Sequence, residues 1–207
     1  MCVRKIVHGL AFILGSALAT SVAAVEPHWF VGFGAGKTST DISESDINRE
    51  FAANGITASA DVDDEDTAWR VFGGYRISDY FAVEAGYLDF GTVEADVNIS
   101  APVVGSANVD ADVTAFTLDL LIPIPLSERF ELIPRIGVAF WDIDSDVSLA
   151  AGGLASSASV DDDGTDFHYG IGLSAKINEL IKVRTNVERI DSDSEITAFT
   201  IGLQFAL

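Results

Sequence analysis

Residues 68–91, AWRVFGGYRISDYFAVEAGYLDFG, decide the fold of this chain. From residue 69 to residue 77, apolar residues or glycine occupy every second position, and residues 81–88 repeat the pattern. Between these two runs, Ser78-Asp79 interrupts the alternation at a place that suits a tight turn. A period of two is the pattern of a β-strand with two different faces. The stretch therefore predicts a β-hairpin.

The same alternation recurs in six further segments, so the sequence predicts eight strands in total. Those segments are residues 29–36, 114–120, 131–140, 167–176, 182–188 and 198–207. After residue 24, no run reaches the roughly 20 apolar residues that a membrane-spanning helix needs. The sequence thus predicts an all-β protein.

Short and long connections alternate strictly between the predicted strands. The short connections lie at residues 78–79, 125–128 and 178–179, and the long ones at 38–66, 90–112, 142–164 and 191–195. Because consecutive antiparallel strands reverse direction, every long connection emerges from the same end. We therefore expect an eight-stranded antiparallel up-and-down barrel.

Charge is segregated along the chain in the same way. The 207 residues include 12 Lys plus Arg and 32 Asp plus Glu, for a net charge of -20, yet the mean hydropathy is +0.30. The four long connections, counted with their flanks Asp89 and Asp166, hold 24 of the 32 carboxylates. A chain this acidic lacks the basic face that nucleic acid requires, so no nucleic-acid partner is expected.

The apolar face of the predicted strands is expected to point outward, toward lipid. The opposite face carries small residues and charges of both signs, which suit a narrow lumen where opposite charges pair. Aromatic residues near the strand ends suit the two interfacial girdles of a membrane barrel; these are Trp29, Trp69, Tyr75, Phe81, Tyr87, Phe130, Phe140 and Phe205. We therefore predict a transmembrane β-barrel. A water-soluble ligand-binding barrel, with its apolar face inward, is a distant alternative.

Residues 1–24 have the three-part layout of a secretory signal peptide. Arg4 and Lys5 precede an apolar core at 10–19, and the small residues at 21–24 offer a cleavage site. The expected mature chain, residues 25–207, forms the outer-membrane barrel domain. It contains no cysteine, because the only cysteine is Cys2, so no disulfide is possible.

Two stretches, YFAVEAGYLDFG at 80–91 and GTDFHYGIGL at 164–173, resemble the OmpA-like outer-membrane β-barrel proteins. The resemblance covers essentially all of residues 25–207. It implies the outer membrane of a Gram-negative bacterium, monomeric insertion, and contact with outer-membrane lipid and lipopolysaccharide. The family usually ends in an aromatic residue, whereas this chain ends in Leu207. No periplasmic peptidoglycan-binding domain, and hence no cell-wall tether, is expected.

Charged residues on the predicted lumen face form the first candidate site. The candidate ion pairs involve Arg70, Glu84, Asp119, Arg135, Arg184 and Glu188, and the same face carries Arg76, Glu131, Lys176 and Lys182. The resemblance implies lumen-blocking pairs at Glu84, Arg135 and Glu188, with Arg70 and Arg184 as partners. Two roles stay open: the ions fill the barrel and satisfy one another, or they line a narrow path for water and small ions.

Two acidic runs are the second candidate site. They contain Asp61, Asp63 and Asp64, and Asp161, Asp162 and Asp163. An EF-hand is excluded, because glycine falls at the fourth position of the second run instead of the sixth. The simplest interpretation is a solvated acidic loop that limits aggregation. The alternative is diffuse binding of Ca²⁺ or Mg²⁺ that bridges the carboxylates to lipopolysaccharide phosphates. Arg189 is expected to face outward near the end of the barrel that carries the long connections. There it either contacts such a phosphate or pairs with Asp191.

No catalytic constellation is predicted. After the signal peptide the chain has only His28 and His168 and no cysteine, which leaves neither a metal cluster with nitrogen or sulfur ligands nor a hydrolytic triad. No cofactor is expected. The predicted function is structural or surface-interacting, with slow passage of water or small ions left open and a narrow porin-like channel as the alternative.

One residue does not fit the predicted strands. Pro134 lies in a strand with no free edge, where proline is disfavoured.

Overall fold

A computed structural model gives the arrangement of residues 26–40, 44–63, 65–101, 104–191 and 196–207. The predicted signal peptide and Asp64 lie outside these described residues. The long strands are β1 (His28–Thr40), β3 (Glu65–Arg76), β4 (Ala82–Ala101), β5 (Gly105–Leu121), β7 (Phe130–Ala151), β8 (Leu154–Lys176), β9 (Ile181–Ile190) and β10 (Ile196–Ala206). Three smaller elements are α1 (Glu44–Ala53), β2 (Thr57–Asp63) and β6 (Ile124–Pro125). Among the described residues, no helix has the length and apolarity to cross a membrane.

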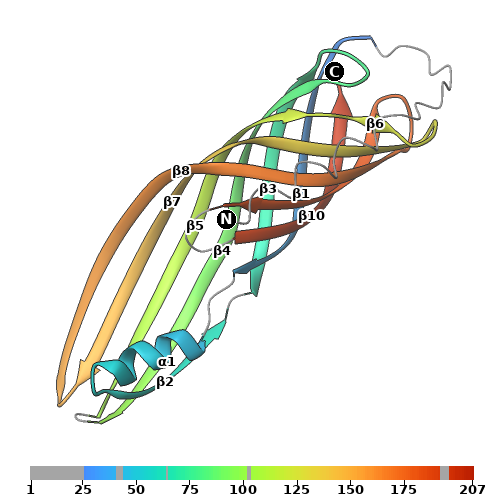
Figure 1. Cartoon of the computed structure of the whole chain (residues 1–207). Helices are drawn as coiled ribbons and strands as arrows, with labels where there is room; N and C mark the ends of the chain where they lie inside the picture. The colour runs from blue at the N-terminus through green and yellow to red at the C-terminus, as the bar shows by residue number, and fades with distance from the viewer. Residues whose placement is uncertain (1–25, 41–43, 64, 102–103, 192–195) are drawn as a thin grey trace, which may run out of the picture.

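The eight long strands close into a ring. Each pairs antiparallel with the next long strand along the chain, and β1 pairs with β10 from Phe30↔Ala206 to Thr40↔Ile196. Figure 1 shows the resulting barrel, with its strands inclined to its long axis. Closure gives every strand two neighbours within the ring. The predicted all-β, eight-stranded antiparallel up-and-down barrel is confirmed.

Three tight turns join strands at one end of the barrel, as predicted. Each is closed by a backbone hydrogen bond: Ile77 N donates to Phe81 O at 2.9 Å, Leu126 N to Phe130 O at 2.8 Å, and Ile177 N to Ile181 O at 2.9 Å. The long connections therefore all lie at the opposite end.

Pro134 is tolerated because β7 changes its partner there. β7 pairs with β5 as far as Leu121↔Arg135 and with β6 from Ile124↔Leu132. At the junction, Ile122 N donates to Pro134 O at 2.9 Å. The N–H and C=O of one residue in an antiparallel strand point to the same neighbour. The donor that proline lacks would thus face this irregular junction and not β8.

The long connections predicted at 90–112 and 142–164 are mostly strand, so the predicted ends of these four strands were wrong. β4 and β5 stay paired as far as Ile99↔Gly105, and β7 and β8 as far as Ala151↔Leu154. The first long connection contains α1 and β2, and β2 pairs with β4. The strands β2, β4, β5, β7 and β8 therefore form a sheet that projects beyond the barrel on one side (Figure 1). We call this part the projecting sheet.

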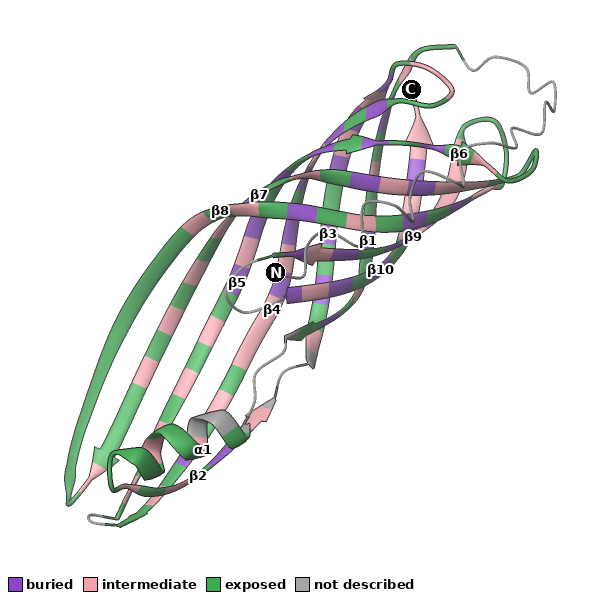
Figure 2. Cartoon of the chain, viewed as in Figure 1, coloured by how far each residue is buried: buried purple, intermediate pink, exposed green. Residues whose placement is uncertain are grey.

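The two faces exchange polarity where the sheet leaves the barrel. Within the ring the outward side chains are apolar, and Phe116 and Phe140 are 49% and 47% exposed. Beyond Phe140, the next outward residues of β7 are Asp142 and Asp144, whereas Ile143 between them faces inward and is half-buried. Lipid requires an apolar outward face and water a polar one, so the switch after Phe140 marks the membrane boundary on β7. Figure 2 shows the alternation of exposed and less exposed residues continuing along β5 and β7 into the projecting sheet.

A bulge in β4 changes which residues of this strand face outward, so that polar residues face water beyond the barrel. The β4–β5 pairing shifts between Asp89 and Thr92, where Gly91 has a φ of 78°. A positive φ of this size is strained for other residues and easy for glycine. Asp66 Oδ2 accepts the Thr92 N–H at 2.7 Å and so fixes the bulge. The shift turns Glu94 outward, opposite Asp110 on β5.

Candidate functional site

The structure brings the six predicted lumen residues together from five strands. They are Arg70 on β3, Glu84 on β4, Asp119 on β5, Arg135 on β7, and Arg184 and Glu188 on β9. Each is 3% exposed or less. They face inward because each occupies the strand positions that alternate with the lipid-facing residues.

Glu84 is shared by three arginines. Its Oε1 accepts a hydrogen bond from Arg70 Nη2 at 2.8 Å, and its Oε2 accepts one from Arg184 Nη1 at 2.6 Å. Arg135 Nη1 lies 3.3 Å from Oε1. Both oxygens of this buried carboxylate are thus held by positive charge.

Two further carboxylates balance the arginines. Glu188 contacts both Arg70 and Arg135, and Asp119 Oδ2 lies 3.8 Å from Arg135 Nη1. Three guanidinium groups therefore face three carboxylates. Burying a charge away from water is costly unless an opposite charge and hydrogen bonds compensate it, and here the formal charges cancel. We call these six residues the ionic layer.

An apolar layer lies beside the ionic layer, on the side of the short turns. It consists of Phe30, Phe72, Ala82, Leu121 and Ile133. The guanidinium carbons of Arg70 and Arg184 lie 4.7 and 4.9 Å from the centre of the Phe72 ring, a cation–π geometry. Gly32 and Gly74 leave room for this layer, since a Cβ on either would overlap an aromatic ring.

His168 is a lumen partner that the sequence did not identify. Its Nδ1 lies 2.7 Å from Asp119 Oδ1, and both side chains are fully buried. His168 is on β8 and its partner is on β5, with β7 between these two strands. Asp119 and His168 both lie opposite Gly137 of β7, so the two side chains meet over this glycine, where a Cβ would overlap Asp119 Oδ1.

A second ion cluster closes the end of the short turns. Glu131 lies 2.6 Å from Lys182 Nζ and 3.2 Å from Arg76 Nη2, and it accepts a hydrogen bond from Ser174 at 3.2 Å. All three charged residues were predicted on the lumen face. Lys176, predicted there too, instead pairs with Glu179 at the surface, 2.7 Å away.

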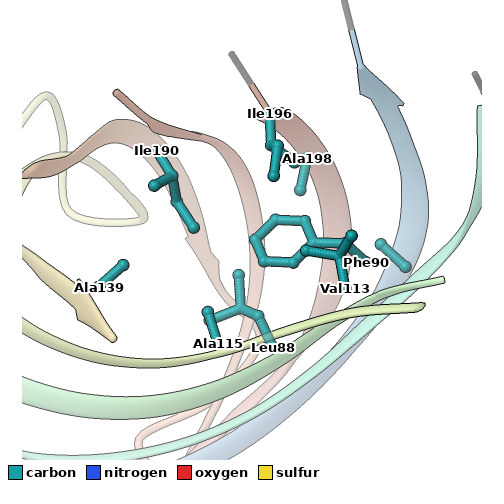
Figure 3. Packing of buried hydrophobic residues seen from close by; sticks show 9 residues of the cluster. Leu88, Phe90, Val113, Ala115, Ala139, Ile190, Ile196 and Ala198 are labelled. Carbon is teal, nitrogen blue, oxygen red and sulfur yellow. The ribbon is translucent and has the colours of Figure 1, made fainter. Parts of the chain in front are cut away.

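A large apolar cluster fills the lumen on the other side of the ionic layer, toward the projecting sheet. Its buried members are Ala68, Leu88, Phe90, Val113, Ala115, Ala139, Ile190, Ile196 and Ala198, and Trp141 and Ile143 pack against it. Figure 3 shows these side chains converging from several strands around Phe90. We call it the upper apolar cluster. The sequence interpretation of a small and polar lumen face did not anticipate it.

The inward face of β7 passes through all of these layers in turn. Glu131 belongs to the second ion cluster, Ile133 to the apolar layer, and Arg135 to the ionic layer. Ala139 and Ile143 then belong to the upper apolar cluster. Charge and apolar packing therefore alternate along the lumen axis.

The two acidic runs lie at opposite edges of the projecting sheet. Asp61 and Asp63 are on β2, which pairs with β4, and Asp161–Asp163 are on β8, which pairs with β7. Because Asp161, Asp162 and Asp163 are consecutive in a strand, Asp162 points to the face opposite its neighbours. Within the described ranges, no group of three or more His, Cys, Asp or Glu side chains is placed to hold a metal ion.

Carboxylates on the outer face of the projecting sheet influence one another. Asp144 lies opposite Asp112 on β5 and Asp161 on β8. The negative charge of Asp142, with further contributions from burial and Asp161, raises the pKa of Asp144. In contrast, hydrogen bonds from the backbone N–H groups of Thr92 and Thr67 lower the pKa of Asp66.

A family model for the OmpA-like transmembrane domain matches residues 24–197. The chain belongs to this family. The OmpA-like chain is therefore an outer-membrane β-barrel protein of a Gram-negative bacterium, as the resemblance implied. No match was found among the curated proteins.

Solved structures show the same fold. The outer membrane protein OprG of Pseudomonas aeruginosa has a TM-score of 0.53 and 16% identity, with 87% of this chain and 96% of that chain covered. The N-terminal β-barrel domain of Pseudomonas aeruginosa OprF gives 0.49 and 13%, covering 88% and 100%. Ail, the attachment invasion locus protein of Yersinia pestis, gives 0.47 and 13%, covering 87% and 97%.

Proposed function

We propose that this OmpA-like protein is a closed, non-conducting barrel whose role is to anchor and present the projecting sheet at the cell surface. The observation that carries the proposal is the upper apolar cluster stacked on the ionic layer. Both span the lumen, and residues in both, such as Leu88 and Glu84, are 1% exposed.

Two barriers in series support a closed lumen. An ion would first have to break into a network in which Glu84 already binds three guanidinium groups. It would then have to pass the side chains around Phe90, which offer no polar group to replace its water. The alternative of a narrow channel for small solutes requires both layers to open together.

The projecting sheet supports a surface role. Its outward face carries Glu94, Asp110, Asp112, Asp144 and Asp161, in rows that cross neighbouring strands. Such a face stays hydrated, repels anionic surfaces and suits structural or interaction roles outside the membrane. We propose a monomer without catalytic activity whose partners are outer-membrane lipid and lipopolysaccharide, with diffuse divalent cations at the acidic face.

A solute-flux assay tests the closed barrel. The protein, purified folded from bacterial outer membranes, is reconstituted into liposomes, and swelling is followed in isotonic solutions of glycerol, arabinose and glucose. The expected swelling rate equals that of liposomes that contain the same protein after heat unfolding. Swelling that falls with increasing solute size would instead identify a narrow channel and overturn the proposal.

A further inference from the structure

Basic residues on the outward face above the lipid-facing belt lie on a different side of the barrel from most of the carboxylates. On β5, β7 and β8 the outward residues above the lipid-facing belt are carboxylates, among them Asp112, Asp144 and Asp161. On β9, β10 and β1 they are Arg189, Thr197, Ser39 and Lys37, whose side chains carry hydrogen-bond donors. Carboxylates on β5, β7 and β8 repel an anion, whereas Arg189 and Lys37 attract it.

Strand register gathers these four residues into one patch. Thr197 lies opposite Arg189 on one side and opposite Ser39 on the other, and Lys37 follows two residues before Ser39 on the same face of β1. β9 and β1 are two strand spacings apart, about 10 Å, which is within reach of a long lysine and a long arginine that lean toward each other. Arginine, lysine and hydroxyl groups are the side chains that bind phosphate oxygens.

A groove continues from this patch down the lipid-facing surface. It is lined by Tyr169, Ile171 and Val187, with Arg189 and Thr197 at the end near the rim. Tyr169 pairs with Arg189 in the β8–β9 ladder, and Ile171 pairs with Val187. The surface thus offers apolar side chains at membrane depth and a guanidinium group at headgroup level, where long basic side chains reach the interface.

We propose that Arg189, Lys37, Thr197 and Ser39 bind a phosphate of lipopolysaccharide in the outer leaflet, and that an acyl chain of the same lipid lies in the groove along Tyr169, Ile171 and Val187. The occupant is a lipid because the groove opens onto the bilayer, and an anionic one because its polar end is basic. Asp191, exposed two residues beyond Arg189, would compete with the phosphate for the guanidinium group. The inference rests on the proposed function in naming lipopolysaccharide as a partner, and it adds a direct contact to the diffuse cations proposed at the acidic face.

Lipid titration followed by native mass spectrometry tests the site. The protein, purified folded from outer membranes and stripped of lipid, receives either bisphosphorylated lipid A, dephosphorylated lipid A or phosphatidylglycerol. The test variant is Lys37→Gln/Arg189→Gln. The matched control is Arg129→Gln/Lys176→Gln, which removes one arginine and one lysine charge at the opposite rim. The heat-modifiable gel shift verifies that each variant is folded.

The wild type and the control are expected to bind bisphosphorylated lipid A equally. The test variant is expected to bind at least about tenfold more weakly, since a hydrogen bond to a charged group contributes about 1.5 kcal/mol or more. The wild type is expected to bind dephosphorylated lipid A at least about tenfold more weakly than bisphosphorylated lipid A.

Equal binding by test variant and wild type, an equal loss in the control, or indifference to the phosphates would overturn the site. Phosphatidylglycerol bound as tightly as lipid A would overturn the assignment to lipopolysaccharide. A wild type that admits sugars into liposomes would overturn the closed barrel and leave this titration unaffected.

Discussion

Glu84 is a single carboxylate that three arginines share, which makes it the residue whose loss should cost the most stability. In Glu84→Gln, the guanidinium groups of Arg70, Arg135 and Arg184 stay buried with one negative charge fewer. Breaking a buried ion pair by neutralising one partner costs about 3–5 kcal/mol. We expect a loss of this size in the free energy of unfolding, measured by urea titration in lipid vesicles with tryptophan fluorescence as the signal.

Glu179→Gln is the control for this measurement. Glu179 pairs with Lys176 at the surface, where its side chain is 87% exposed. Exposed pairs of this kind contribute little, so no measurable change is expected. If Glu84→Gln is as stable as Glu179→Gln, the ionic layer does not stabilise the barrel as described.

The Asp119–His168 contact should be visible as an energetic coupling. Asp119→Asn, His168→Gln and the double variant form a thermodynamic cycle, and we expect a coupling free energy of about 1–3 kcal/mol, as found for residues of one buried network. Chemical unfolding of the four proteins measures it. Additive losses in the double variant would mean that the 2.7 Å contact between these side chains has no energetic weight.

At the residue scale, the sequence predicts which face of its strand a residue occupies better than it predicts which side chain that residue contacts. The period of two placed Glu84, Arg135 and Glu188 inward, because alternation is a property of each strand alone. The partner of Asp119 depends on the register of β5 against β7 and of β7 against β8, which places Asp119 and His168 on either side of Gly137. The alternation within one strand does not encode that register, so the sequence did not pair these two residues.

Within single elements, the position of the membrane boundary on β7 is open to direct test. The expected mature chain contains no cysteine, so single cysteines can be placed at Phe140, Asp142 and Asp144. In intact vesicles a water-soluble maleimide should label Asp142→Cys and Asp144→Cys rapidly and Phe140→Cys slowly. Labelling of Phe140→Cys at the same rate would place the boundary elsewhere.

The raised pKa of Asp144 predicts that the part of β7 and β8 in the projecting sheet is more stable against local unfolding when this group is neutral. A carboxylate with a raised folded-state pKa adds stability below its unfolded value, and that stability is lost as the pH rises through the folded value. Asp144→Asn should therefore slow amide hydrogen exchange in the projecting part of β7 and β8 at neutral pH. Asp79→Asn, in a short turn at the opposite end, is the control, and an equal effect from it would contradict the prediction.

At the element scale, the extent of β4, β5, β7 and β8 was the largest error of the sequence interpretation. The alternation does continue, with Val109, Ala111 and Val113 facing inward on β5 between polar residues. Its polarity is inverted, however, because water replaces lipid outside. An apolar outer face consequently marks only the membrane-spanning part of each strand. The sequence interpretation therefore ended the strands at the membrane boundary and assigned the remainder to acidic loops.

For the molecule as a whole, the alternation of short and long connections was sufficient to predict ring closure and a common end for the extensions. The number of strands and the strict order of connections fix an up-and-down barrel without knowledge of any contact. The contents of the lumen needed the structure. Leu88, Phe90 and Ile190 come from strands that are not all neighbours, and the closed wall brings them into one cluster.

Single-channel recording in a planar bilayer tests the closed lumen most directly. The protein is purified folded from outer membranes, and a fluorophore on Asp142→Cys counts the inserted molecules. With many inserted barrels in the membrane, the stacked ionic layer and upper apolar cluster predict a current indistinguishable from that of the bare bilayer. Steady ohmic steps whose number follows the number of inserted molecules would contradict a closed barrel.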